Sequence, residues 1–125
     1  MPSIIQKKSY DSVQIFWLNK DLIKERLDQS IEALVKSSPE IEKVVLFGSF
    51  AAGKETIGSD LDILIVVKSC REKFIDRSLK YQNYFKGIGL DTDVFVYAKD
   101  ELREGVKIAE TALKNGKILY DSTKK

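Results

Sequence analysis

Two acidic residues stand at the head of the most apolar segment of the chain. Asp60 and Asp62 flank Leu61, and the residues that follow, 63–67, are Ile-Leu-Ile-Val-Val. Because side chains alternate along a strand, both carboxylates are expected on one face, with Cα atoms about 6.6 Å apart. Carboxylates this close repel each other, and a divalent cation would relieve the repulsion. A solvated strand end whose acids pair with lysines has the same pattern, so the pair alone leaves both interpretations open.

The segment just upstream could bind an anion. Residues 44–47 form an apolar run typical of a buried strand, and residues 49–53 are predicted to form one or two helical turns. Free N–H groups at a helix N-terminus attract phosphate, Gly48 would allow close backbone approach, and Ser49 would add a hydroxyl donor. Taken alone, this segment is equally typical of an ordinary strand-to-helix turn. In combination with the acidic pair, it favours a nucleoside triphosphate held with Mg²⁺.

A third carboxylate is expected to complete such a site. Phosphoryl and nucleotidyl transfer need an acid that completes the metal site and positions or deprotonates the acceptor hydroxyl. Asp93 precedes the apolar run 94–96, whereas Asp91 lies two residues earlier on the same face of the predicted strand. Asp93 is preferred because it directly adjoins the apolar run, and Asp91 is the competing candidate.

The composition excludes several kinds of chemistry. The chain of 125 residues has no histidine and one cysteine, Cys70, and its formal net charge is +2. Ser-His-Asp catalysis, imidazole zinc sites and intrachain disulfides are therefore excluded, and any catalytic metal needs oxygen ligands, as Mg²⁺ and Mn²⁺ do. The small positive charge does not indicate direct nucleic-acid binding. Without a run of about 20 apolar residues or a signal peptide, the chain is expected to stay off the membrane and in the cytoplasm.

Periodicity predicts alternating strands and helices that would position these residues. Strands are predicted over 13–17, 44–47, 61–67 and 94–97, with a last extended piece over 118–120. Helices are predicted from the cap Asn19 to a stop at residues 37–39, over 49–53, from the capping-box spacing of 69–72 to about 85, and over 100–114. The first helix is expected to bury one stripe of residues: Leu22, Ile23, Leu27, Ile31, Leu34 and Val35. The third is expected to turn an apolar face to the core: Phe74, Ile75, Leu79 and Tyr81. Residues 1–11 are expected to lack regular structure. The order indicates a single domain over residues 1–125, of α/β or α+β class.

Several short motifs then stand in an order that resembles one family. They are Leu-Phe-Gly-Ser over 46–49, Ala-Gly over 52–53, Ser-Asp-Leu-Asp-Ile-Leu over 59–64, Asp-Val-Phe-Val over 93–96 and Gly-Lys-Ile-Leu-Tyr over 116–120. This pattern resembles the DNA polymerase β-like nucleotidyltransferase superfamily, and most closely its minimal nucleotidyltransferases. The resemblance implies a mixed β-sheet flanked by helices. It also implies ATP as donor at Gly48 and Ser49, and two Mg²⁺ ions, or Mn²⁺, held by Asp60, Asp62 and Asp93.

The resemblance further implies a reaction and a partner. Many minimal members are antitoxins paired with a HEPN ribonuclease toxin, and some transfer AMP to a tyrosine of that toxin. Because little more than one helix follows the third acid, the acceptor is expected on a second chain. The expected function is therefore Mg²⁺-dependent transfer of NMP, most often AMP, to a HEPN-type partner protein. Two alternative functions stay open: a binding module that neutralises a partner by occlusion, and a nucleotide-binding subunit of a larger transferase. The sequence also leaves open whether the chain forms a homo-oligomer.

One residue departs from the family pattern. Many relatives have arginine where this chain has Ala52, immediately before Gly53. Lys54 could supply the missing positive charge; otherwise a weaker hold on the triphosphate is expected. The departure bears on activity and leaves the expected fold unchanged.

Overall fold

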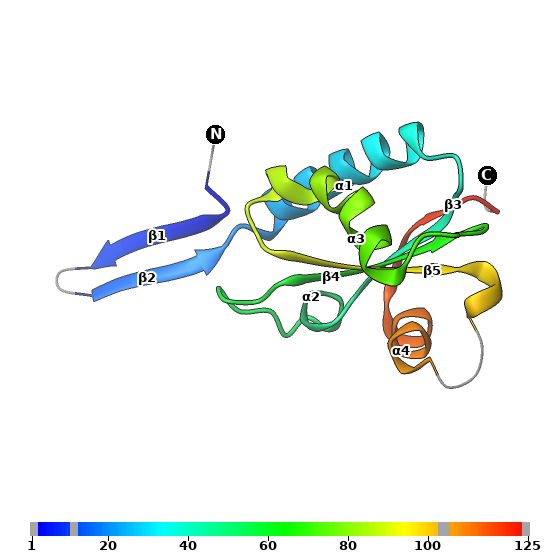
Figure 1. Cartoon of the computed structure of the whole chain (residues 1–125). Helices are drawn as coiled ribbons and strands as arrows, with labels where there is room; N and C mark the ends of the chain where they lie inside the picture. The colour runs from blue at the N-terminus through cyan, green and yellow to red at the C-terminus, as the bar shows by residue number, and fades with distance from the viewer. Residues whose placement is uncertain (1–2, 11–12, 103–105, 124–125) are drawn as a thin grey trace.

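The computed structural model describes residues 3–10, 13–102 and 106–123, and Figure 1 shows the arrangement of its elements. In chain order the elements are β1 (Ile5–Tyr10), β2 (Val13–Leu18), α1 (Lys20–Ser37), β3 (Ile41–Phe47), α2 (Ser49–Ala52), β4 (Leu61–Val67), α3 (Phe74–Gln82), the 3₁₀ helix η1 (Asn83–Ile88), β5 (Thr92–Ala98), the 3₁₀ helix η2 (Lys99–Glu101), α4 (Lys107–Asn115) and β6 (Lys117–Asp121).

A four-stranded mixed sheet forms the body of the molecule. Its strand order is β5-β4-β3-β6, with β4 parallel to β5 and with β3 antiparallel to both β4 and β6. Helices α1 and α3 lie over one face of this sheet, and α4 lies over the other (Figure 1). The expected mixed sheet flanked by helices is thereby confirmed. Strands β1 and β2 form a separate antiparallel hairpin.

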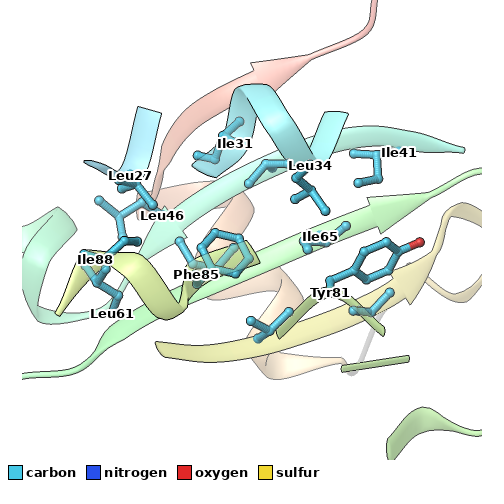
Figure 2. Close-up of a cluster of buried hydrophobic side chains, with 14 of the residues drawn as sticks. Leu27, Ile31, Leu34, Ile41, Leu46, Leu61, Ile65, Tyr81, Phe85 and Ile88 are labelled. Carbon is cyan, nitrogen blue, oxygen red and sulfur yellow. The ribbon is translucent and has the colours of Figure 1, made fainter. Parts of the chain in front are cut away.

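Strand β4 is buried on both faces, which explains its unbroken apolar sequence. Leu61, Ile63 and Ile65 are fully buried in the larger core cluster, together with side chains of α1 and η1 (Figure 2). Leu64 and Val66 point to the opposite face and belong to a smaller cluster with Ala112 of α4. The strand that carries Asp62 is therefore held rigidly from two sides.

Helix α1 forms as its sequence predicts. The side chain of Asn19 accepts a hydrogen bond from the Leu22 N–H at 3.1 Å, and the helix ends at Ser37, two residues before Pro39. Its buried residues follow the predicted stripe: Ile23, Leu27, Ile31 and Leu34. All four belong to the larger core cluster together with buried residues of β3 and β4, so α1 supplies much of that core.

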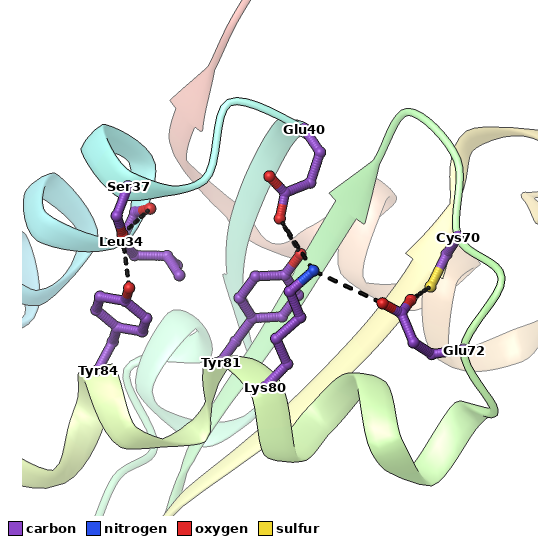
Figure 3. A network of polar contacts seen from close by, with 8 residues as sticks. All are labelled: Leu34, Ser37, Glu40, Cys70, Glu72, Lys80, Tyr81 and Tyr84. Carbon is purple, nitrogen blue, oxygen red and sulfur yellow. Dashed lines mark hydrogen bonds and ion pairs between the residues drawn. The ribbon is translucent and has the colours of Figure 1, made fainter.

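A polar network joins the end of α1 and the start of β3 to α3 (Figure 3). The Tyr81 hydroxyl donates to the Glu40 carboxylate at 2.6 Å, and Lys80 lies 3.6 Å from the same carboxylate. Burial of Tyr81 and its hydrogen bond to Glu40 both raise the pKa of the phenol. The Tyr84 hydroxyl and the Ser37 hydroxyl share a further hydrogen bond of 2.6 Å. These contacts hold α3 and η1 in position relative to α1 and the sheet.

The N-terminal segment, for which no regular structure was predicted, contains a strand. Residues 1–11 were expected to lack regular structure, but Ile5–Tyr10 pairs along its whole length with β2, from Ile5 opposite Leu18 to Tyr10 opposite Val13. The expectation was wrong because β1 has no apolar periodicity of its own: five of its six side chains are exposed. Cross-strand pairing, which a local pattern does not reveal, makes it a strand.

Helix α3 starts later than predicted and presents a different face. It begins at Phe74 without a side-chain cap, because the Glu72 carboxylate accepts a hydrogen bond from the Cys70 thiol instead of completing a capping box. Ile75 and Leu79, expected in the core, are 73% and 65% exposed. The face toward β5 carries polar residues instead: Ser78 donates to the Val94 carbonyl at 2.8 Å, and Gln82 donates to the Thr92 carbonyl.

The helix predicted over 100–114 is divided. Residues 99–101 form η2, and α4 begins at Lys107; residues 103–105 of the predicted helix lie outside the described residues. In the described part of the chain, each helix is too short or too polar to cross a membrane.

Gly116 lets α4 and β6 lie close against β3. A Cβ atom at this position would lie 2.4 Å from the Ala112 carbonyl oxygen, 2.6 Å from Val45 Cγ1 and 2.7 Å from the Leu46 carbonyl oxygen. Two of these three atoms belong to the backbone, so they cannot move aside as a flexible side chain would. The glycine is required here by lack of space, because its own φ is an ordinary −81°.

Replacing Gly116 by alanine is therefore expected to lower the free energy of unfolding by about 1–3 kcal/mol, the usual cost of overpacking. Urea denaturation measures this loss. Gly87→Ala is the matched control, because nothing lies within 4 Å of its ideal Cβ and its φ is not positive; it should leave stability within about 0.5 kcal/mol of wild type. Equal losses in both variants would contradict this account of Gly116.

Candidate active site

The pairing register of the sheet brings the predicted site residues into one row. Asp62 of β4 lies opposite Phe47 of β3 on one side and opposite Asp93 of β5 on the other. Because Asp60 precedes Asp62 by two residues, its position corresponds to the same face. The row lies at one end of the strands, next to the start of α2. The sheet thus gathers residues that are more than thirty positions apart in the sequence.

Gly48 makes room for the Asp62 carboxylate. A Cβ atom on Gly48 would lie only 2.1 Å from Asp62 Oδ2, so the carboxylate lies directly against the backbone between β3 and α2. Gly48 also has φ 78° and ψ −154°, a conformation that essentially only glycine adopts. The glycine is needed both for the turn and for the close approach of the acid.

Helix α4 covers only the deeper part of this sheet face. Its Ala112 packs with Val45 and Leu64, two register positions beyond the acidic row. Asp60 and Asp93 are exposed, and Asp62 is half-buried. The rings of Phe47 and Phe95, with centroids 5.7 Å apart, form an apolar pair next to the acids. The site is therefore an open, acidic strand end above an apolar floor.

Burial and the neighbouring negative charges disfavour the ionised form of Asp62. Burial raises the pKa of this carboxyl above its usual range, and the negative charges of Asp93 and then Asp60 raise it further. The contributions from both neighbours show that the three carboxylates are close enough to interact. An ionised Asp62 is thus destabilised in the folded protein unless a cation approaches.

The donor set suits a hard divalent cation, although the side chains are not gathered around one point. Among the described residues, no group of three or more acidic or cysteine side chains already has a metal-binding arrangement. Carboxylate oxygens are the ligands that Mg²⁺ prefers, and the exposed side chains of Asp60 and Asp93 are not held in place by core packing. By donor chemistry, Asp60, Asp62 and Asp93 fit such an ion.

The strand-to-helix turn expected at Gly48 and Ser49 is present. Gly48 ends β3, and Ser49 begins α2, whose single turn is closed by a hydrogen bond of 3.1 Å from the Ala52 N–H to the Gly48 carbonyl. Ala52 and Lys54 are both exposed. The side chain of Lys54 is therefore available on the surface near this turn, as the expectation for a replacement charge requires.

Asp91 and Asp93 differ in where the register places them. Asp93 lies directly opposite Asp62, and it contributes to the raised pKa of Asp62. Asp91 precedes the strand, and its backbone carbonyl accepts a hydrogen bond of 2.9 Å from the Leu61 N–H. Geometry favours Asp93 as the third acid, and its catalytic role stays a prediction.

Sequence reasoning missed Glu55, which anchors the loop between α2 and β4. The Glu55 side chain is 4% exposed and forms an ion pair with Lys20 at the start of α1. The hydrogen bond from Lys20 lowers the pKa of this carboxyl. A lone acid in a polar loop has no periodic signal, so the sequence gives no indication that it is buried.

The chain is similar to known proteins in sequence and in fold. The model of the family described as "Polymerase beta, Nucleotidyltransferase" matches residues 29–125. A search among curated protein sequences finds no significant match. The fold resembles that of a Sulfolobus solfataricus protein described as a nucleotidyltransferase, with 24% identity and a TM-score of 0.63 over 84% of this chain and 85% of that one.

Two toxin–antitoxin structures share the fold as well. One is a toxin–antitoxin crystallised with AMP-PNP, with 20% identity and a TM-score of 0.59; the other is a mutant of the toxin–antitoxin MntA–HpeT, with 18% identity and a TM-score of 0.58. Each match covers 76% of this chain and 73% of the other. At these identities the similarity establishes the fold.

Removing the charge of Asp62 is expected to stabilise the metal-free protein. Because the folded-state pKa of Asp62 lies above its ordinary value of about 3.9, ionisation destabilises the fold, increasingly as the pH rises through the raised pKa. Asp62→Asn should therefore raise the melting temperature by a few degrees at neutral pH in EDTA. Asp28→Asn, at an exposed position of α1, is the control and should leave it unchanged. A lower melting temperature for Asp62→Asn would refute the account.

Gly48 can be tested separately from the acids. Gly48→Ala should displace the Asp62 carboxylate and weaken binding of Mg²⁺-ATP at least about tenfold, a loss of about 1.4 kcal/mol. Gly53→Ala is the control, because Gly53 also has a positive φ, 72°, but nothing lies within 4 Å of its ideal Cβ. It should cost about 1–2 kcal/mol of stability and leave affinity near wild type. Titration calorimetry distinguishes these outcomes, and equal affinity losses would contradict the role of Gly48.

Proposed function

Because the chain belongs to the polymerase β nucleotidyltransferase family, we propose that it transfers AMP from ATP to a hydroxyl of a partner protein, as the antitoxin of a HEPN-type toxin. The observation that carries the proposal is the row in which Asp62 lies between Gly48 and Asp93. This arrangement puts a crowded, half-buried carboxylate directly against the backbone turn that begins α2, at an open strand end. Family membership supports nucleotidyl transfer, and the donor, the metal and the partner belong to the proposal.

The proposed chemistry assigns a distinct task to each acid. Asp60 and Asp62 would hold Mg²⁺, which when bound neutralises the triphosphate and the charge developing on the leaving pyrophosphate. Asp93 would complete that site and orient the acceptor hydroxyl, taking its proton as the oxygen attacks the α-phosphorus. The bond between the α-phosphorus and the bridging oxygen then breaks, and pyrophosphate leaves. Gly48 and Ser49 would hold the β- and γ-phosphates.

The open shape of the site supports a protein acceptor. Asp60 and Asp93 are exposed, and α4 stops short of the acidic row, so a side chain from a second protein can reach Asp93. The toxin–antitoxin structures with the same fold agree with a toxin as that second protein. The HEPN identity of the partner rests on the resemblance of the sequence motifs.

Replacing Asp93 and replacing Asp62 are expected to have different effects on Mg²⁺-ATP binding and on transfer. Asp93→Asn should keep Mg²⁺-ATP affinity within about tenfold of wild type, a difference near 1.4 kcal/mol, but slow transfer at least about a hundredfold. Asp62→Asn should weaken binding and transfer together. The measurements are titration with Mg²⁺-ATP and single-turnover transfer of label from ATP to the co-expressed partner. Asp91→Asn, at the competing exposed acid, is the control and should transfer normally.

Three results would change the conclusion. Normal transfer by Asp93→Asn with loss in Asp91→Asn would assign the third carboxylate to Asp91. Full neutralisation of the partner without any label on it would indicate occlusion in place of catalysis. Absence of Mg²⁺-ATP binding by the wild-type protein would contradict both this reaction and the alternative of a nucleotide-binding subunit of a larger transferase.

A further inference from the structure

The hairpin β1–β2 stands away from the body of the molecule (Figure 1). Its base is anchored, because Ile4 is buried in the larger core cluster and its carbonyl accepts a hydrogen bond from the Asn19 N–H at 2.6 Å. Beyond the base, large apolar side chains are open to solvent: Val13 is 56% exposed, Phe16 47% and Trp17 43%. The family model matches residues 29–125, so the hairpin lies outside the matched residues.

The two edges of the hairpin are protected very differently. Strand β1 carries Lys7 and Lys8, and its Ile5 N–H donates to the Ser3 hydroxyl at 3.2 Å. Strand β2 reads Val-Gln-Ile-Phe-Trp-Leu and has no charged residue. In the part of the chain that the structure describes, β2 pairs with no strand other than β1. Charges and hydrogen-bonded edges normally prevent strand addition, so β2 is the edge on which a further strand can pair.

In the body of the protein, one edge strand of the sheet is blocked from pairing with a further strand. The edge strand β5 has its Thr92 and Val94 carbonyls occupied by hydrogen bonds from Gln82 and Ser78 of α3. No described helix plays this part for β2. An isolated hairpin of two strands is also only marginally stable in water, and additional strands are needed to support it.

A hollow lies beside the second half of β2. It has a volume of about 500 Å³ and is lined by the consecutive residues Phe16, Trp17 and Leu18, by the ion-paired Lys20 and Glu55, and by Thr56 and Ile57. Successive side chains of a strand point to opposite faces, so a hollow lined by all three adjoins the edge of the strand. Ile57, which is 41% exposed, adds an apolar wall on the far side. The hollow can therefore receive apolar side chains of an added strand.

We propose that β2 pairs with β2 of a second copy of this chain, so that two hairpins form one four-stranded antiparallel sheet across a two-fold axis. The second copy is the occupant that fits, because one symmetric contact pairs both unprotected edges and brings the exposed apolar residues of both chains side by side on one sheet. The lysine-bearing strands β1 then lie at the outer edges of the joined sheet, where charge prevents further addition. Pairing through β1 would instead bring Lys7 and Lys8 of the two copies together.

The proposal predicts a dimer that depends on β2. Sedimentation velocity over a concentration series should show a species of twice the chain mass of 14.2 kDa. Phe16→Lys and Trp17→Lys should each raise the dissociation constant at least about tenfold. Leu79→Lys is the control, because it places the same charge on another exposed apolar residue, 65% exposed, on α3; it should change the constant by less than about threefold. A monomer at all concentrations, or a dimer broken by Leu79→Lys alone, would overturn the proposal.

Cross-linking gives a second readout that does not depend on disrupting the interface. A two-fold axis perpendicular to the sheet places a central residue of β2 close to its own copy, and Phe16 is central in Val13–Leu18. In a Cys70→Ser background, which removes the single native cysteine, Phe16→Cys should oxidise to a disulfide-linked dimer. Lys7→Cys is the matched control, because Lys7 lies opposite Phe16 on the other edge of the hairpin. Cross-linking of Lys7→Cys without Phe16→Cys would assign the contact to β1 and refute the pairing of β2.

Discussion

The register of β4 between β3 and β5 is the constraint on which the rest of the structure depends. Main-chain hydrogen bonds on both sides set Asp62 opposite Phe47 and Asp93, and burial of alternate residues on both faces prevents a slip of one position. Such a slip would turn Asp62 into the core and an isoleucine outward. The same apolar residues that stabilise the sheet therefore determine where the acidic row lies.

The acidic row destabilises the folded protein. Asp62 is half-buried, and Asp93 and Asp60 add to its raised pKa, so the folded protein holds together charges that repel. The cost is tolerated because β4 is secured elsewhere along its length, and because α4 leaves the strand end open to water and ligands. Functional sites commonly sacrifice stability in this way, and the ligand restores it on binding.

Most of the core and of the site could be predicted from local patterns, and the failures have identifiable causes. Helix α1 and β4 have strong periodic or continuous apolar signals, and short motifs single out Gly48 and Asp62. Their contact required the pairing register, which no local pattern contains. Strand β1 was missed because its own residues are polar and its partner defines it. The buried face of α3 was misjudged because Ser78 hydrogen-bonds to a strand carbonyl, an interaction invisible to hydrophobic periodicity.

The late position of α4 and β6 in the chain has a consequence for how the protein is made. The smaller core cluster needs Ala112, and β3 obtains its second neighbour only when β6 arrives. During synthesis, Val45, Leu64 and Val66 therefore stay exposed on one face of an incomplete sheet until residues 107–121 have left the ribosome. Chains arrested before that point would offer an apolar surface to chaperones and proteases, although all the acidic residues of the site have already been translated.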